Sequence, residues 1–129
     1  MKGVDMANKT LYSRLGGYDA IAAVVDDLMT KMATDQRIAK YFVGHSEDSK
    51  KRIRQLQIDM ISQATGGPSF YLGRDMKAVH KGLNIDGTEW QLAINYIVKI
   101  LDNFNVGDAE QKEVLTLLNA IKGDIVEKP

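Results

Sequence analysis

Apolar residues recur every three or four positions along four long stretches of this chain, and this spacing constrains the fold more than any other feature. Such spacing places the apolar residues on one face of an α-helix, whereas a half-buried strand would alternate apolar and polar residues. No stretch alternates convincingly. The four stripes are Ile21, Val24, Val25, Leu28 and Met32; Ile53, Leu56, Met60, Ile61 and Ala64; Trp90, Ile94, Ile97, Leu101 and Phe104; and Val114, Leu117, Leu118, Ile121 and Ile125. The sequence therefore predicts an all-α fold.

Glycine and capping signals mark the expected ends of these helices. The helix with the second stripe should stop at Gly66-Gly67. Thr88-Glu89-Trp90-Gln91 has the pattern of a capping box and should open the third. Asp108-Ala109-Glu110-Gln111 is a similar signal for the last. A short helix is expected over residues 35–42, followed by a polar loop.

Length and composition indicate one domain and exclude several kinds of site. A chain of 129 residues can bury most of the surface that its unfolded form would expose. We expect a loose tail over residues 1–9 and a single domain over 10–129. Seventeen basic and seventeen acidic residues cancel, so no net charge attracts nucleic acid or an anionic membrane. The absence of cysteine excludes disulfides, iron–sulfur clusters and thiolate zinc sites.

Neither a signal peptide nor a membrane span is apparent. The opening residues lack an apolar core, and no apolar run approaches the roughly 20 residues that cross a bilayer. We expect a cytoplasmic protein and a monomer. The basic run over residues 50–54 is interpreted as a solvated helix face.

The segment over residues 66–87 does not fit an ordinary helical bundle. It holds five glycines and a proline, so little of it can be long helix. It nevertheless carries Phe70, Tyr71, Met76, Val79 and His80. Large side chains on a weakly structured segment need a surface to pack against, and a flat apolar cofactor would supply one.

Two polar residues have both an ordinary and a functional interpretation. A lone histidine such as His80 is usually a half-buried imidazole, and a tetrahedral zinc site would need more ligands than this region offers. Haem iron needs only one protein imidazole, because the porphyrin supplies four nitrogens. Gln57 falls within an apolar stripe, where its amide bonds a backbone carbonyl, sits at the stripe's edge, or faces a polar ligand. His45 lies in the polar loop and is expected to be exposed.

Several motifs, taken in order, resemble the truncated, or two-on-two, haemoglobins of group I. Leu11-Tyr12-Ser13-Arg14-Leu15-Gly16-Gly17 is similar to the family's opening motif, and Asp35 with Tyr41-Phe42 to the end of its short third helix. Gly66-Gly67-Pro68 with Tyr71-x-Gly73 resembles its second glycine motif, and Met76-x-x-x-His80 its proximal segment. The resemblance extends from about Leu11 to Ile125.

The resemblance implies two antiparallel helix pairs around a non-covalent b-type haem, with His80 as the proximal iron ligand. Phe42 would pack on the porphyrin face, and Tyr71, Met76, Trp90 and Ile94 would line the pocket. Arg52, Arg74 and Lys77 would approach the propionates. No histidine follows His80, so covalent attachment through a late histidine is not expected.

On the distal side the chain departs from the family. Gln57 matches a position that hydrogen-bonds the bound ligand, but Met29 stands where a tyrosine is usual. Met29 either coordinates the iron or packs as an ordinary apolar side chain. Ile53 and Leu56 occupy two other distal positions, and Ile61 matches one that can hold a tunnel-gating phenylalanine.

Three functions remain open at this point. The first is reversible binding of dioxygen or another diatomic gas. The second is nitric oxide dioxygenation or a related redox reaction supported by a reductase, against which the loss of the usual tyrosine donor counts. The third is a helical interaction module without haem.

Overall fold

The structure is a computed structural model that describes residues 9–128, and its regular elements are all helices. They are α1 (Leu11–Leu15), α2 (Tyr18–Thr34), the 3-10 helix η2 (Ala39–Tyr41), α3 (Glu47–Ala64), α4 (Met76–His80), α5 (Gly87–Asn103) and α6 (Asp108–Ile125). Within 9–128 the only β pairing is an isolated bridge between Asp86 and Lys128. The all-α prediction is confirmed. The predicted tail over residues 1–9 lies, except for Lys9, outside the described residues, as does Pro129.

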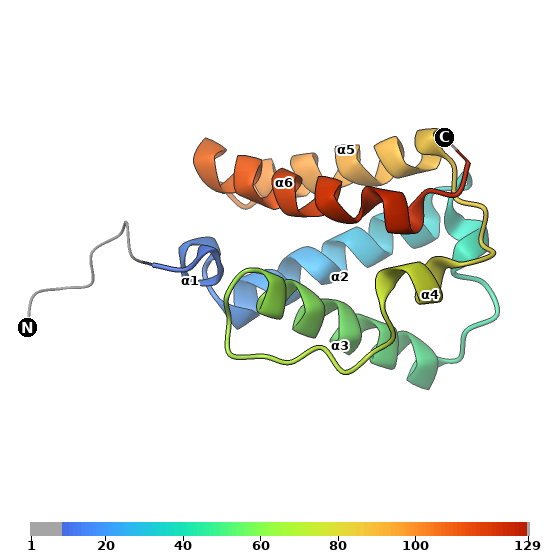
Figure 1. Cartoon of the computed structure of the whole chain (residues 1–129), viewed down its shortest axis with the longest axis horizontal. Coiled ribbons are helices and arrows are strands. Elements are labelled where there is room, and N and C mark those ends of the chain that lie inside the picture. Colours follow the sequence, from blue (N-terminus) through green and yellow to red (C-terminus); the bar gives the residue numbers. More distant parts are fainter. Residues whose placement is uncertain (1–8, 129) are drawn as a thin grey trace, which may run out of the picture.

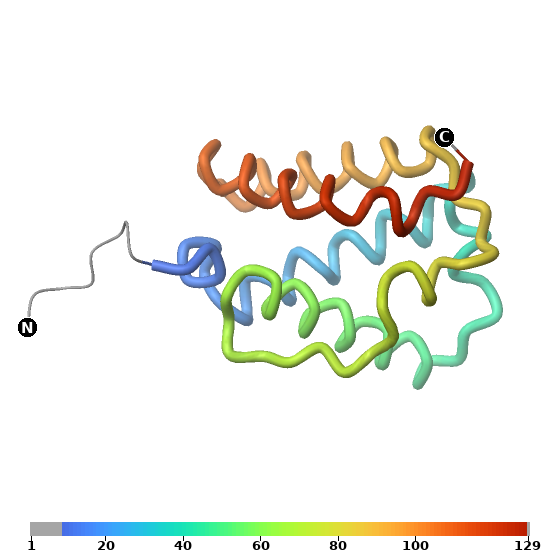
Figure 2. The backbone as a smooth tube through the Cα atoms, viewed as in Figure 1, coloured from blue at the N-terminus to red at the C-terminus, as the bar shows by residue number. Residues whose placement is uncertain are grey.

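The long helices form two layers (Figure 1). Helix α2 packs against α3 on one side and α5 on the other, and α5 runs beside α6. The short helix α4 contacts α6, and α1 contacts both α2 and α6. The tube in Figure 2 shows the long connection that leaves the end of α3 and turns back along that helix before it enters α4. None of the described helices is long and apolar enough to span a membrane.

The contact between α2 and α3 is a closed apolar core. Val25 and Ile58 are fully buried there, with Ile21 and Ala22 beside them. Ser62, one turn after Ile58, is also fully buried, and its hydroxyl has no hydrogen-bond partner among residues 9–128. The most buried face of α3 is therefore not the predicted stripe, which begins at Ile53, but an adjacent one.

Both capping predictions were wrong in position. Helix α5 begins at Gly87, and its capping box joins Asp86 to Glu89: the Asp86 carboxylate accepts from the Glu89 amide at 2.7 Å, and Glu89 accepts from the Asp86 amide at 3.1 Å. The expected box at Thr88 lies two residues too late. Helix α6 follows Gly107 without a side-chain cap. Gln111 instead donates to the Asp102 carboxylate and the Val106 carbonyl, at 2.8 and 3.0 Å.

The segment over residues 35–42 contains a turn and the three-residue helix η2 in place of the expected longer helix. The Asp35 carboxylate accepts from the backbone amide and the guanidinium of Arg37, at 2.9 and 2.7 Å, and from the Tyr96 hydroxyl of α5. Local side-chain bonds of this kind compete with helix formation. The Arg37 and Tyr96 hydrogen bonds hold the pKa of the Asp35 carboxyl well below its ordinary value.

Candidate functional site

A cavity of about 500 Å³ lies between the helix layers and is the main candidate site. Its volume falls within the range of about 300–1,000 Å³ that is usual for cofactor and small-molecule sites. The wall is largely apolar and comes from the six helices α1 to α6 and their connections. The lining residues are Leu15, Ala20, Ile21, Val24, Leu28, Met60, Ile61, Ala64, Thr65, Tyr71, Asp75, Met76, Ile97, Leu101, Phe104, Val106, Val114, Leu117, Leu118, Ala120 and Ile121.

Three of the five residues of the predicted stripe of α3 line this cavity. Met60, Ile61 and Ala64 are part of the wall, while Ile58 packs on Ile21, Ala22 and Val25 of α2. Gln57 precedes Met60 and Ile61 by three and four positions, so it lies on the same helix face one turn earlier. Gln57 is not itself among the residues that line the cavity.

The Gln57 amide is half-buried, and no hydrogen-bond partner for it exists among residues 9–128. Gln55 on the neighbouring face differs, because its amide bonds the Tyr18 hydroxyl and the Asp59 carboxylate at 3.1 and 3.0 Å. Of the three interpretations of Gln57, a bond to a backbone carbonyl is therefore not seen. The side chain remains available to a ligand.

Helix α4 holds His80 in a defined orientation. The Asp75 carboxylate caps the helix by accepting from the Ala78 amide at 2.8 Å, and Met76 and Asp75 line the cavity. The His80 ring nitrogen Nδ1 lies 2.8 Å from the Met76 carbonyl oxygen. A carbonyl can only accept, so Nδ1 carries the proton and Nε2 is the ring nitrogen left for another partner. His80 is half-buried and is not itself part of the cavity wall.

Two glycines let the connection from α3 to α4 pack closely. A Cβ on Gly67 would lie 2.5 Å from the Tyr12 ring, and one on Gly73 would lie 2.4 Å from the Tyr71 hydroxyl. Tyr71 lines the cavity; its hydroxyl donates to the Arg74 carbonyl, and its amide donates to the Gln63 side chain at 2.6 Å. The large side chain at position 71 is thus fixed by a short loop that only glycine permits.

Of the other predicted distal residues, Ile61 lines the cavity, and Met29, Ile53 and Leu56 do not. Met29 packs on the closed core of α2 and α3, whereas Leu28 of the same helix lines the cavity. Ile53 and Leu56 are half-buried on the first turns of α3, outside the cavity wall. Ile61 belongs to the wall and also packs on the closed core.

Phe42, Trp90 and Ile94 are also outside the cavity wall. Trp90 is buried, and the other two are half-buried. The segment before Phe42 is tied to α5, because the Tyr41 hydroxyl donates to Glu89 at 2.8 Å. Burial and this hydrogen bond raise the pKa of Tyr41 to about 12.

The three predicted propionate contacts are exposed cations. Arg52 lies on α3, Arg74 in the connection and Lys77 on α4, and none of them pairs with a carboxylate within residues 9–128. Their neighbour Arg54 instead holds Asp26 of α2 at 3.0 Å. His45 is exposed and bonds the Ser49 hydroxyl at 3.1 Å.

Sequence reasoning did not assign a site role to the walls contributed by α2 and α6. Val24 and Leu28 face the cavity from α2, and Val114, Leu118 and Ile121 face it from α6. Their spacing predicted that they point inward. Whether these residues face a cavity or another side chain depends on how the helices cross, and the apolar pattern of one helix does not predict that crossing.

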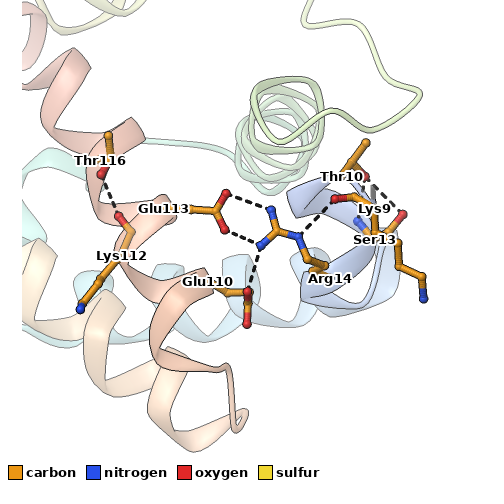
Figure 3. A network of polar contacts seen from close by, with 8 residues as sticks. All are labelled: Lys9, Thr10, Ser13, Arg14, Glu110, Lys112, Glu113 and Thr116. Atoms are coloured by element: carbon orange, nitrogen blue, oxygen red, sulfur yellow. Dashed lines mark hydrogen bonds and ion pairs between the residues drawn. The ribbon is translucent and has the colours of Figure 1, made fainter. Parts of the chain in front are cut away.

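A shallower surface pocket of about 380 Å³ adjoins the cavity and shares Ala64, Thr65 and Leu117 with it. The ion pairs of Arg14 stand at this end of the molecule (Figure 3). Arg14 of α1 donates to Glu110 at 2.9 Å and, through both terminal nitrogens, to Glu113 of α6. The Arg14 guanidinium lowers the pKa of the Glu113 carboxyl.

Comparison with known proteins gives consistent matches over almost the whole chain. A family model described as bacterial-like globin matches residues 10–127. The group 1 truncated hemoglobin GlbN of Nostoc sp. is 32% identical over 119 residues, which cover 92% of this chain and 98% of the relative.

Two solved structures have the same fold. Truncated hemoglobin from Tetrahymena pyriformis in its Fe(III) form superposes with a TM-score of 0.83 at 28% identity, covering 93% of this chain and 100% of that one. The 2/2 hemoglobin from Synechococcus sp. with covalently attached heme gives 0.82 at 25% identity, with the same two coverages. These superpositions confirm the predicted two-on-two helical arrangement.

Proposed function

Because the chain belongs to the bacterial-like globin family, we propose that it is a b-type haem protein that binds dioxygen or another diatomic gas, with His80 as the one protein ligand to the iron. Haem-based gas binding is the activity that membership of this family supports. We propose three points beyond family membership: that His80 is the axial ligand, that the haem is of the b type, and that the ligand is a diatomic gas such as dioxygen.

The observation that carries the proposal is the hydrogen bond from His80 Nδ1 to the Met76 carbonyl at 2.8 Å. Metal-bound histidines generally donate their second ring N–H to a carbonyl or carboxylate, which fixes the tautomer and the ring orientation. In this chain the partner belongs to the same short helix. The imidazole is thus oriented before any cofactor arrives.

The surrounding residues fit a haem in three further respects. The cavity of about 500 Å³ has the apolar wall that a porphyrin requires. Arg52, Arg74 and Lys77 are exposed cations that suit the propionates. Gln57 supplies an amide without an internal partner on a cavity-facing helix. Haem, when bound, supplies an iron with one position for an imidazole and one for a gas.

On this proposal each residue has a limited role. His80 holds the iron through Nε2. The apolar wall keeps water away from the site. Gln57 donates a hydrogen bond to a gas that can accept one, and Met29 packs on the closed core and supplies no donor, since a thioether has none. We also propose that attachment is non-covalent, because no cysteine is present and no histidine follows His80.

The test is an absorption spectrum of the purified protein in ferric, ferrous and carbonyl forms. A Soret band that survives purification supports the proposal, and its absence after haem addition favours a haem-free helical module. Extraction of all haem into acidified organic solvent would support non-covalent attachment. Haem that stays on the protein would contradict it.

His80→Ala should abolish stable haem retention or remove the iron–histidine vibration. His45→Ala is the matched control, because His45 is the other histidine of the chain and is exposed. Full haem content with an unchanged vibration in His80→Ala would overturn the assignment.

A further inference from the structure

The loop that follows His80 is held by a single carboxylate from the end of the chain. The Gly82 amide donates to Glu127 Oε2 at 3.1 Å, and the Asn84 amide donates to Glu127 Oε1 at 2.9 Å. These residues are separated by more than forty positions in the sequence. Glu127 thus joins the segment after α6 to the loop after α4.

The backbone of this loop is shaped to receive an anion. Gly82 and Asn84 have positive φ values of 85° and 57°. Alternation of left- and right-handed residues makes neighbouring N–H groups converge into an anion-binding concavity. The Asn84 and Gly82 amides hold the pKa of the Glu127 carboxyl below its ordinary value.

The same loop is bonded directly to His80. The Leu83 amide, between the two that Glu127 accepts, lies 3.2 Å from the His80 carbonyl oxygen. The His80 ring, for its part, is oriented by the hydrogen bond from Nδ1 to the Met76 carbonyl. The residue proposed to bind iron is therefore fixed at its ring by α4 and at its backbone by a loop that Glu127 anchors.

Glu127 is itself fixed by backbone bonds. Its amide donates to the Ile85 carbonyl at 2.9 Å, and the Gly87 amide donates to the Lys128 carbonyl at 2.9 Å. Figure 2 shows the end of the chain beside the connection from α4 to α5. The carboxylate consequently has a defined place relative to both α5 and α6.

We propose that Glu127 is a positioning residue for His80: by binding the Gly82 and Asn84 amides it sets the height and tilt of α4, and hence of the imidazole, relative to the haem cavity. This inference rests on the proposed function, because it gives His80 the role of iron ligand. Glu127 is not among the residues that line the cavity, so it would act through the backbone of the loop.

The experiment compares Glu127→Ala and Glu127→Gln with the wild-type holoprotein. Asp124→Ala is the matched control, because Asp124 is an exposed carboxylate of the last turn of α6. Three quantities are measured: hydrogen exchange at the Gly82 and Asn84 amides, the frequency and width of the iron–histidine vibration, and the rate of haem transfer to an acceptor globin.

In Glu127→Ala we expect faster amide exchange, a shifted or broadened iron–histidine vibration and haem loss about 2- to 10-fold faster. Glu127→Gln keeps one acceptor oxygen and should lie between that variant and the wild type. Asp124→Ala should match the wild type in all three measurements.

The outcomes separate this inference from the proposed function. If the wild type takes up no haem, the proposed function fails, and this inference with it. If the wild type binds haem through His80 but Glu127→Ala leaves the vibration and haem loss unchanged, the positioning role alone is overturned. Faster amide exchange without a spectroscopic change would show that Glu127 only stabilises the loop.

Discussion

Replacement of Gln57 by leucine tests the distal side of the proposed site. Gln57→Leu removes the amide but keeps a side chain of similar size one turn before Met60 and Ile61, which line the cavity. Dioxygen accepts a hydrogen bond well, and carbon monoxide accepts one poorly. We therefore expect faster dioxygen release and little change in carbon monoxide binding.

The expected change in the dioxygen dissociation rate follows from the surroundings of the Gln57 amide. Gln57 has no hydrogen-bond partner within residues 9–128, so a bond to the gas would replace no internal bond. A neutral hydrogen bond contributes about 0.5–1.5 kcal/mol, which corresponds to about 2- to 13-fold in the dissociation rate. Met29 has no donor that could substitute.

The assay measures dioxygen dissociation by rapid displacement and carbon monoxide rebinding after photolysis. Gln55→Leu is the control, because it makes the same change on the same helix but on a face where the amide bonds Tyr18 and Asp59. It should leave both gases unaffected. An equal change for both gases in Gln57→Leu, or none for dioxygen, would refute the distal role.

Further predictions concern substitutions at Met29, Ser62, Thr65 and Tyr41. Met29→Tyr should add a hydroxyl donor and slow dioxygen release, in the wild type and in Gln57→Leu; an unchanged rate in both backgrounds would contradict the distal placement of position 29. Ser62→Ala should raise the free energy of unfolding by about 1 kcal/mol, because the fully buried Ser62 hydroxyl has no partner among the described residues. Thr65→Val should lower the free energy of unfolding, because the Thr65 hydroxyl donates to the Ile61 carbonyl at 2.7 Å. Denaturant titration measures both changes. Burial raises the pKa of Tyr41 to about 12 from an ordinary value of 10.0. The contribution of Tyr41 to stability is therefore present below pH 10 and is lost as the pH rises through 12. A titration followed by tyrosinate absorbance should show one ionisation near pH 12 that Tyr41→Phe removes.

The long helices could be predicted from the sequence because periodicity reports directly which positions share a face. The sequence could not predict which neighbouring helix or cavity each apolar face meets. On α3 the stripe from Ile53 to Ala64 supplies three residues to the cavity wall, yet the fully buried positions are Ile58 and Ser62. A helix that packs on α2 and also borders a cavity has two inward faces, and periodicity alone does not tell which of them is the more buried.

Local signals also left choices that only tertiary contacts decide. Asp86-x-x-Glu89 and Thr88-x-x-Gln91 both have the spacing of a capping box. The structure selects Asp86, where the Lys128 carbonyl receives the Gly87 amide and fixes the start of α5. For His80, the resemblance to the truncated haemoglobins suggested an iron ligand, but the orientation of the ring depends on the Met76 backbone carbonyl, which residue types alone do not reveal.

The ion pairs of Arg14 have a consequence for folding during synthesis. Arg14 and its two carboxylate partners are separated by 96 and 99 residues, so this contact cannot form until almost the whole chain has been made. Helices α2 and α3 are consecutive long helices and can pair much earlier, since closing a short loop costs less entropy than closing a long one. A ribosome-bound chain that stops before Glu110 should therefore contain the paired α2 and α3 while α1 lacks its ion pairs to α6. A protease should cut such a chain near α1 faster than it cuts the complete chain.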